Sequence, residues 1–396
     1  MHSFFVLLSK AIRLKPMSPL FVKSATTYFW YFGVHGLAIP FLALFLNYRG
    51  FSSLAIGELL AIYTATRILG PTCWAMFADK TGKQLFVIRL GTFLAFACFC
   101  LLFWAQGYWP IAFALAMFSL FWTAILPQLE VMTNLAIKRS PKIYARIRLW
   151  GSLGFFFTSV VAGEVIDAYS PEAFTWLGFI ILACLWGSSL LLKQPRMTKQ
   201  ALQNTGSIFE KLLTKTFIWF FLAGLLLQIS FGPYYSFFAL YLRDFNYPSY
   251  AVGLLMGIGI FAEIAIFLIL GTLFKLFSVK TLLVASLLLS AIRWYLTGHF
   301  ADSVWLLAFA QCFHAFSFGM YHSASLQYLQ RHFNGNQQNR GQAIYIAGVY
   351  GIGGALGAYV AGVFWAEGLG AQLAYNIAAL VALFATGFAL MLPSKK

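Results

Sequence analysis

Residues 251–270 read AVGLLMGIGIFAEIAIFLIL, a stretch of apolar and small residues in which Glu263 is the only charged side chain. A helix of roughly 20 apolar residues is long enough to cross the hydrocarbon core of a bilayer. A charged side chain at the centre of such a helix costs roughly 2.5–3.5 kcal/mol on insertion scales. The stretch therefore predicts a membrane span, and it raises the question of what a carboxylate does inside it.

The rest of the chain has the same character. Of its 396 residues, 61% are hydrophobic and only 10% are charged, whereas a soluble protein carries about 25% charged residues. The chain contains further apolar runs of membrane-spanning length, and we predict an all-α membrane protein with 12 transmembrane helices. The predicted spans are 20–46, 53–77, 85–105, 109–137, 146–168, 173–192, 217–242, 250–272, 281–299, 303–329, 341–366 and 370–392.

The formal net charge of +16 is unevenly distributed. If the N-terminus is placed in the cytoplasm, nearly all Lys and Arg outside the spans fall on the cytoplasmic side, and only Arg49 and Arg243 fall on the other. This is the positive-inside pattern. It indicates a multi-pass membrane protein with both termini in the cytoplasm, and it makes a nucleic-acid partner unnecessary. The first ten residues, MHSFFVLLSK, are too short in their apolar part for a signal peptide; an interfacial segment, or a true start at Met17, are the two alternatives.

The longest polar interruption, KQPRMTKQALQNTGSIFEKLLTKT, divides the predicted helices equally. We therefore expect an N-terminal six-helix bundle over residues 1–192, a cytoplasmic linker over 193–216 and a C-terminal six-helix bundle over 217–396.

The two halves repeat one another. SLAIG at 53–57 recurs as SYAVG at 249–253, and at the same offset GLAIPFLALFL at 36–46 faces GPYYSFFALYL at 232–242. At this offset Arg67 corresponds to Glu263. Parallel six-helix halves with a midplane site between them resemble the major facilitator fold.

A second signature follows the second predicted span, where residues 75–84 read AMFADKTGKQ. This segment resembles the loop motif of the major facilitator superfamily, in which an Asp at a helix end precedes a basic residue, a Gly and another basic residue. The Gly permits a tight turn. The resemblance implies a gating role, with no substrate contact, for Asp79, Lys80, Gly82 and Lys83.

Several ionisable side chains fall well inside predicted spans: Arg67, Glu130, Arg148, Glu263 and Arg293, together with His35, His314 and His322. Residues at equal distances from a short loop lie at equal depth in a helical hairpin. Glu130 is therefore expected level with Arg148, and Glu263 level with Arg293. We predict one midplane cluster of Arg67, Glu263, Arg293 and His314, and one pair of Glu130 and Arg148. The alternative is that these are buried ion pairs that only fix helix packing.

Such a cluster suits proton coupling. Burial opposes the charged form of a carboxyl, and a nearby Arg favours it, so a carboxyl takes up a proton when its Arg turns away to a substrate. His314 and His322 are eight residues apart and cannot share one metal ion. The five cysteines show no metal-binding spacing, and no HExxH, GxSxG or GxxxxGK[ST] sequence occurs, so we expect no cofactor, no metal and no enzymatic activity.

The order of these residues along the chain resembles lactose permease, with an acid, an Arg, an acid, an Arg and a His on spans 4, 5, 8, 9 and 10. The resemblance implies substrate contact by Glu130 and Arg148, and proton coupling by Glu263, Arg293 and His314. Lactose permease has a second acid on span 10, whereas this chain has Ser317 three residues after His314.

A resemblance to the phenylpropionate permease family covers nearly the whole chain. It is carried by ARIRLWGSLGF at 145–155, AVGLLMGIGIFAEIAIF at 251–267, SAIRWYL at 290–296 and HAFSFGMYHSASLQYL at 314–329. It implies a bacterial transporter of aromatic carboxylates. Aromatic residues make up 19% of the chain, and Trp30, Trp122 and Trp150 are candidates for stacking on a substrate.

We therefore expect a monomeric secondary transporter of a bacterial inner membrane, coupled to protons as a symporter, that imports a small organic substrate such as 3-phenylpropionate. The substrate-binding candidates are Arg67, Glu130, Arg148, Trp150, Trp122, His35 and His322. Import of a sugar or nucleoside, efflux by proton antiport, and a non-transporting membrane sensor are the alternatives.

Overall fold

The computed structural model describes residues 19–137, 139–194, 208–334 and 337–394, all of which are helical or lie in turns and loops without a strand. Twelve helical segments within these ranges are long and apolar enough to cross a membrane. The prediction of an all-α protein with 12 membrane spans is confirmed. The N-terminal segment over 1–18 and most of the predicted linker lie outside the described residues, and the division into two six-helix bundles stays a prediction.

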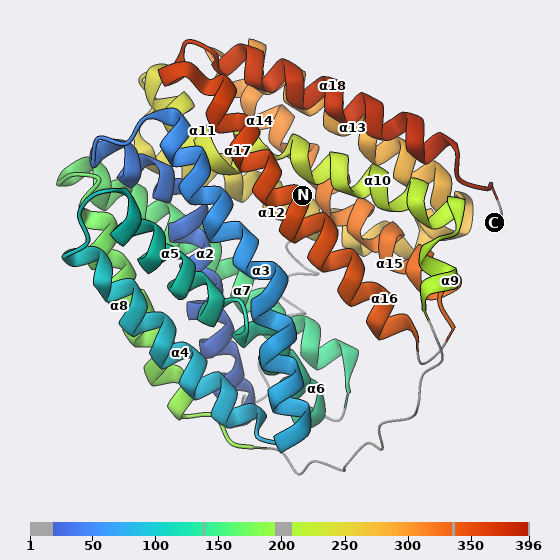
Figure 1. Cartoon of the computed structure of the whole chain (residues 1–396), viewed down its shortest axis with the longest axis horizontal. Helices are drawn as coiled ribbons and strands as arrows, with labels where there is room; N and C mark the ends of the chain where they lie inside the picture. Colours follow the sequence, from blue (N-terminus) through green and yellow to red (C-terminus); the bar gives the residue numbers. More distant parts are fainter. Residues whose placement is uncertain (1–18, 138, 195–207, 335–336, 395–396) are drawn as a thin grey trace, which may run out of the picture.

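The helices before the linker form what we name the N-terminal half (Figure 1). The fourth span is interrupted after Trp122, so that it consists of two helices. The elements are α2 (Pro19–Tyr48), α3 (Ser53–Thr81), α4 (Gln84–Cys100), η1 (Leu101–Phe103), α5 (Tyr108–Trp122), α6 (Ile125–Ala136), α7 (Pro141–Ala168) and α8 (Ala173–Leu190).

The helices after the linker form the C-terminal half, and three of its spans are interrupted. The elements are α9 (Phe209–Leu212), α10 (Lys215–Ser230), α11 (Gly232–Asp244), α12 (Ser249–Leu276), α13 (Val279–His299), α14 (Val304–Cys312), η2 (Ala315–Met320), α15 (Tyr321–His332), α16 (Gln338–Tyr345), η4 (Ile346–Gly353), α17 (Gly354–Trp365), η5 (Ala366–Gly368) and α18 (Ala371–Leu390). The segments η2 and η4 are π-helical, and π-helical turns are frequent at functional sites.

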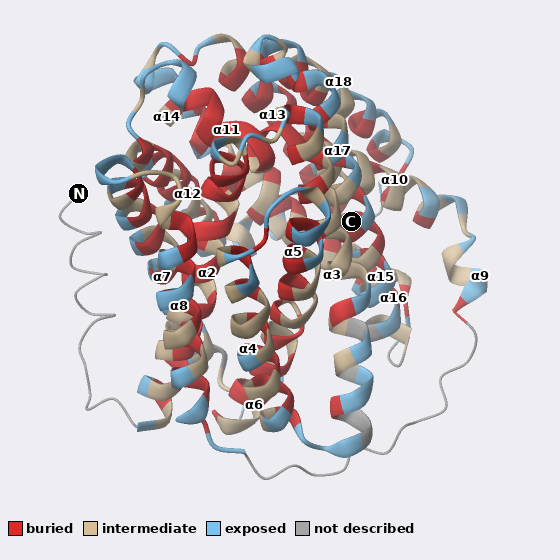
Figure 2. Ribbon diagram, turned by 60° about the vertical axis from the view of Figure 1, so that its left-hand side comes forward, coloured by how far each residue is buried: buried red, intermediate tan, exposed pale blue. Residues whose placement is uncertain are grey.

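Small residues let the helices approach closely. A Cβ at Gly154 of α7 would lie 2.1 Å from the carbonyl oxygen of Phe29 on α2, and a Cβ at Gly36 of α2 would lie 2.3 Å from that of Phe155. Small residues serve this purpose in membrane helix packing. On the outside, large apolar side chains such as Leu268 and Phe384 are exposed, while buried residues gather where the helices pack together (Figure 2). This is the surface expected of a protein solvated by lipid.

The two halves meet closely at one end of the molecule. A Cβ at Gly57 of α3 would lie 2.7 Å from the Cα of Gly362 on α17, and a Cβ at Gly163 of α7 would lie 2.5 Å from the Cα of Tyr250 on α12. The beginning of α3 therefore packs on the end of α17, and the beginning of α12 packs on the end of α7.

Two carboxylates, one on each half, form hydrogen bonds across these contacts, and we call these bonds between the halves ties. Glu367, in η5, accepts a hydrogen bond from the backbone nitrogen of Ser53 at 2.8 Å and returns one from its own nitrogen to Ser53 Oγ at 3.0 Å. Asp167, near the end of α7, accepts a bond from the backbone nitrogen of Ser249 at 2.6 Å. Ser53 and Ser249 open α3 and α12 and are equivalent in the sequence repeat, so the two ties are related by the same symmetry. We call this the closed end.

At the opposite end the halves separate, and the ribbons of α6 and α16 lie well apart (Figure 1). We call this the open end.

A third hydrogen bond joins the halves near the ends of α2 and α11, from Arg243 Nη2 to Asn47 Oδ1 at 3.0 Å. Every hydrogen bond that the structure gives between described residues of the two halves is one of these ties.

Candidate functional site

Arg293 lies on α13 and is fully buried. Its Nη1 donates to Nδ1 of His314 at 3.0 Å and to Oγ of Ser317 at 3.1 Å, and its Nη2 donates to Oε1 of Gln311 at 2.9 Å. Its guanidinium carbon lies 4.3 Å from the centroid of the Tyr234 ring. All these partners are uncharged, and no carboxylate within the described ranges forms an ion pair with Arg293. Hydrogen bonds and aromatic faces hold this cation in place of an acid.

His314 connects Arg293 to Glu263. Because a guanidinium can only donate, Nδ1 of His314 is the acceptor, and the neutral ring carries its proton on Nε2. That nitrogen lies 3.9 Å from Oε2 of Glu263. The side chains of His314 and Glu263 are 11% and 18% exposed. The structure thus brings together Glu263, Arg293 and His314, the three residues for which proton coupling was predicted.

The π-helical segment η2 begins directly after His314 and makes room for Glu263. A Cβ at Gly319, within η2, would lie 2.9 Å from Cγ of Glu263. The wider π-turn and the missing side chain let α12 and the tenth span approach each other at this point. The interruption of the tenth span therefore positions the acid beside the imidazole.

The packing of α12 on α7 shows which N-terminal residues lie level with Glu263. A Cβ at Gly253 would meet the backbone of Ser159, and one at Gly257 would meet the ring of Phe156, as expected of antiparallel helices. Continuing this register places Glu263 level with Trp150 and within one turn of Arg148. Arg148 therefore lies near the level of Glu263, on the other side of the contact between the halves.

Glu130 and Arg148 are near each other but form no ion pair. Oε1 of Glu130 accepts a hydrogen bond from the Tyr144 hydroxyl at 3.0 Å. The guanidinium of Arg148 lies instead over the ring of Phe32, 3.8 Å from its centroid, and its charge acts on Glu130 from a distance. The hairpin argument placed these residues at the same depth, but it did not include the neighbouring helix α2, whose aromatic face takes the cation.

Arg67 does not join the cluster around Glu263 as an ion pair. A Cβ at Gly354 would meet Thr64, and one at Gly351 would meet Ile68, so Arg67 lies between two contacts of α3 with α17 and η4. Its guanidinium carbon is 5.9 Å from the centroid of the Tyr63 ring. Because Arg67 belongs to the N-terminal half, the contact between the halves decides its distance from Glu263, and the repeat alone does not give that distance.

Two of the predicted substrate-binding residues, His35 and Trp122, lie in one cluster of aromatic side chains. The centroids of their rings are 4.2 Å apart. Tyr31 and Tyr63 stack on Trp122, with centroid distances of 5.4 Å and 6.4 Å. We name Tyr31, His35, Tyr63 and Trp122 the ring cluster. Trp122 is fully buried within it.

The remaining candidates lie elsewhere. Trp150 is 38% exposed and belongs to the level of Glu263. His322, on α15, forms a hydrogen bond of 2.9 Å between its Nδ1 and the hydroxyl of Tyr350. Tyr350 lies in η4, so this bond joins the two spans that contain π-helical turns.

Of the loop motif, the structure describes the turn. Gly82 has φ of 67°, the left-handed conformation that glycine adopts without strain, and it caps α3. Lys83 is the N-cap residue of α4. The side chains of Asp79 and Lys80 lie outside the described part of the chain, and the gating role of the motif stays a prediction.

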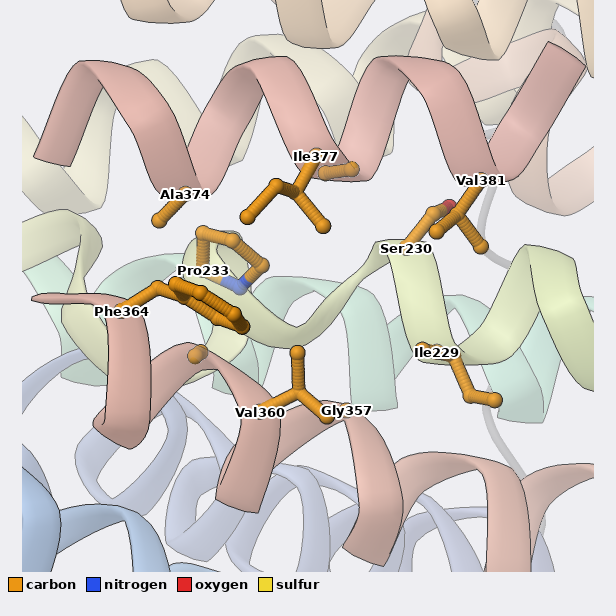
Figure 3. A pocket seen from close by; sticks show the side chains of 11 residues that line it. Ile229, Ser230, Pro233, Gly357, Val360, Phe364, Ala374, Ile377 and Val381 are labelled. Atoms are coloured by element: carbon orange, nitrogen blue, oxygen red, sulfur yellow. The ribbon is translucent and has the colours of Figure 1, made fainter. Parts of the chain in front are cut away.

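A small cavity between α10, α11, α17 and α18 lies away from these residues (Figure 3). Its volume is about 10 Å³, which is room for at most one water molecule. Apolar side chains such as Pro233, Val360 and Phe364 line it. It is a packing gap and has no place in the chemistry of the site.

Several residues of the site were missed from the sequence. Gln311 and Ser317 lie three residues before and after His314, on the same helical face, and this spacing was the signal that identifies them. Tyr144 lies four residues before Arg148 and has the same kind of signal. No sequence pattern indicated the contacts of Tyr63 or Tyr234.

Comparisons with known proteins agree with this architecture. A family model described as "MFS_1 like family" matches residues 21–377. A protein of Escherichia coli (strain K12) named "Probable 3-phenylpropionic acid transporter" is 29% identical over 365 residues, which cover 87% of this chain and 93% of that protein. The maltose permease of Geobacillus stearothermophilus is 26% identical and covers 87% and 85% of the two chains.

Solved structures share the fold. A crystal structure of a mutant of the nucleoside transporter NupG is similar with a TM-score of 0.85 at 16% identity, over 94% of this chain and 99% of that one. Twelve spans, the family model and these relatives lead to one conclusion. The chain belongs to the MFS_1 like family of the major facilitator superfamily, and it is a multi-pass membrane transporter rather than an enzyme.

Proposed function

We propose that this transporter is a proton symporter that imports a small organic carboxylate, and that Glu263 is its proton-binding residue. The observation that carries the proposal is the surroundings of Glu263. Its carboxylate is largely buried, and its nearest ionisable neighbour is a His314 ring that Arg293 keeps as a hydrogen-bond acceptor. A buried carboxylate without a cation in contact is costly to keep charged, and a proton relieves that cost.

Protonation of Glu263 changes the charge balance of the site. While Glu263 is charged, it offsets the positive charge of Arg148, which acts on it across the two halves. Once Glu263 is neutral, that positive charge is less compensated. An anionic substrate then binds more favourably, because opposite charges attract strongly in a site of low dielectric constant. Proton and anion therefore bind together, which is the requirement for symport.

The arrangement of the halves supports alternating access. With both termini in the cytoplasm, as the charge distribution indicates, the closed end faces outward and the open end faces the cytoplasm. Substrate contact by Arg67, Glu130 and Arg148 fits this proposal, since all three belong to the N-terminal half, opposite the proton-binding group.

The first experiment is uptake of labelled 3-phenylpropionate into proteoliposomes with and without an inward proton gradient. We expect the gradient to drive accumulation in the wild type. The variant Glu263→Gln should lose this accumulation and keep exchange of internal for external substrate, because exchange requires no net proton movement. Glu210→Gln, which changes an exposed acid on α9, is the matched control. Uphill uptake by Glu263→Gln would remove Glu263 from the proposal, and efflux driven by an opposite gradient would reverse the direction.

A sugar or nucleoside is the second candidate substrate. The name of the maltose permease relative favours it. The carboxylate of Glu130 and the guanidinium of Arg148 can also form hydrogen bonds with the hydroxyl groups of such a substrate. Maltose and uridine are therefore tested as competitors in the same assay. If either one is accumulated while 3-phenylpropionate is not, the carboxylate assignment is wrong and the fold and coupling proposals stand.

A further inference from the structure

The ring cluster contains an unusual concentration of unpartnered polar atoms. Among the described residues, Nε1 of Trp122 has no hydrogen-bond partner, and Nδ1 of His35 and the hydroxyl of Tyr63 lie near the Tyr31 backbone and the Arg67 side chain without forming a well-aligned bond. Tyr63 is 5% exposed and Trp122 is fully buried. Buried polar groups are almost always paired, with protein or with a bound molecule. Several unpaired groups in one cluster indicate that a polar occupant belongs there.

The charge beside the cluster is positive. The guanidinium carbon of Arg67 lies 5.9 Å from the centroid of the Tyr63 ring, and the Tyr63 hydroxyl is near the Arg67 side chain. Arg67 forms no ion pair with any acid in the described ranges. An anion best matches an occupant that meets hydroxyl and indole donors beside a guanidinium without an acidic partner.

The other two arginines of the site are less suited to an anion. Arg293 is fully buried, and its Nη1 and Nη2 already donate to three acceptors. The guanidinium of Arg148 lies over the ring of Phe32, and Glu130 is close to it, so its charge attracts an anion from a distance and does not bind it directly. Arg67 is partly exposed, and no acid in the described ranges forms an ion pair with it.

The position of Arg67 also suits a ligand that must be released. Arg67 follows Thr64, which packs on Gly354, and precedes Ile68, which packs on Gly351. Both contacts join α3 to the C-terminal half. A ligand at Arg67 therefore lies beside the contact between the two halves, and movement of one half against the other changes its surroundings.

We propose that Arg67, Tyr63 and Trp122 form the subsite for the substrate carboxylate, with His35 as its fourth polar neighbour. This inference rests on the proposed function and assigns the two ligands to different halves of the protein. The anion is bound by the N-terminal half and the proton by Glu263 of the C-terminal half. Tyr63 is a specificity-determining residue, because its hydroxyl donates a stronger hydrogen bond to an anion than to an uncharged group of the same shape.

The test is equilibrium binding of acetate, benzoate and 3-phenylpropionate, with uncharged 3-phenylpropionamide as the comparison, to the purified full-length protein in lipid nanodiscs. Arg67→Gln should weaken binding of the carboxylates roughly 10- to 100-fold, and Tyr63→Phe roughly 3- to 10-fold. Neither change should weaken binding of the amide. The preference for acid over amide is the readout, since a change that only loosens the protein weakens both ligands.

Tyr375→Phe is the matched control. Tyr375 is also fully buried with an unpartnered hydroxyl, but it lies on α18, where it contacts Tyr241 and Trp365. It should leave the acid preference unchanged. Thermal unfolding of each variant shows whether the protein is folded, and Tyr63→Phe alone tests the subsite if Arg67→Gln does not fold.

The outcomes separate this inference from the proposed function. If the wild type prefers 3-phenylpropionate to its amide and Tyr63→Phe and the Arg67 variant keep that preference, water fills the cluster and the subsite is wrong, while the proposed function stands. If only benzoate or acetate binds, and these variants weaken it, the subsite stands and the substrate is wrong. If no carboxylate binds the wild type, both are wrong.

Discussion

The closed end offers the sharpest test of how the two halves are held. Asp167 and Glu367 each accept a hydrogen bond from the first backbone nitrogen of a helix in the opposite half. A side chain that caps a helix in this way contributes about 1 kcal/mol, and a carboxylate gains up to about 1 kcal/mol more from the helix dipole. The two ties together therefore favour closure by about 2–4 kcal/mol.

The double variant Asp167→Ala with Glu367→Ala removes both ties. A loss of about 2–4 kcal/mol shifts the ratio of closed to separated ends by about 30- to 1000-fold toward separation. Each single variant should give an intermediate shift, because the two ties are far enough apart to act independently.

The shift is measured as a distance between spin labels in proteoliposomes. Tyr169 and Leu369 are 83% and 95% exposed, belong to opposite halves and lie at the closed end, so labels there report on its separation. Cysteines replace these two residues in a parent without the native cysteines. Glu172→Gln is the control, since Glu172 binds Arg49 within one half. An unchanged distance distribution in the double variant would refute the proposed role of the ties.

Other predictions concern the site and the packing of the halves. Arg293→Lys should lower uphill uptake more than 10-fold while leaving membrane insertion intact, because one ammonium cannot serve His314, Ser317 and Gln311 in the geometry of the guanidinium; uptake near the wild-type rate would contradict this. Gly154→Ala should destabilise the protein by about 1–3 kcal/mol, since its Cβ would lie 2.1 Å from the Phe29 carbonyl oxygen. Gly187→Ala has nothing within 4 Å of its Cβ and should leave the midpoint of thermal unfolding unchanged. Tyr144→Phe removes the hydrogen bond to Glu130 and should change KM for uptake several-fold with little effect on the maximal rate; an unchanged KM would show that Glu130 acts without Tyr144.

The sequence predicted the fold through signals that act along one helix or one hairpin. Span length, the positive-inside pattern and the repeat are local or periodic, and the structure confirms the 12 spans they predict. Hairpin geometry placed Glu263 near Arg293 and His314, and the structure has them in one group. These residues were predictable because their helices are neighbours in the chain.

The rest depended on packing between helices that are distant in the sequence. Glu130 and Arg148 were predicted to lie at the same depth as a pair. Instead Arg148 lies over Phe32 of α2, and Glu130 accepts a hydrogen bond from Tyr144. The π-helical turns η2 and η4 were also not predicted, since a π-turn forms where tertiary packing rewards it and leaves no strong pattern in composition. The ties of Asp167 and Glu367 cross between the halves, and a repeat of one half does not show how the two halves meet.

The most direct test of the central claim is the movement of protons when substrate is added. In lightly buffered proteoliposomes without an imposed gradient, addition of 3-phenylpropionate outside should make the external medium transiently alkaline as protons enter with the substrate. The account predicts this signal for the wild type and for Glu210→Gln, and its loss in Glu263→Gln. Entry of labelled substrate into wild-type vesicles without any alkalinisation, or an equal signal from Glu263→Gln, would contradict it.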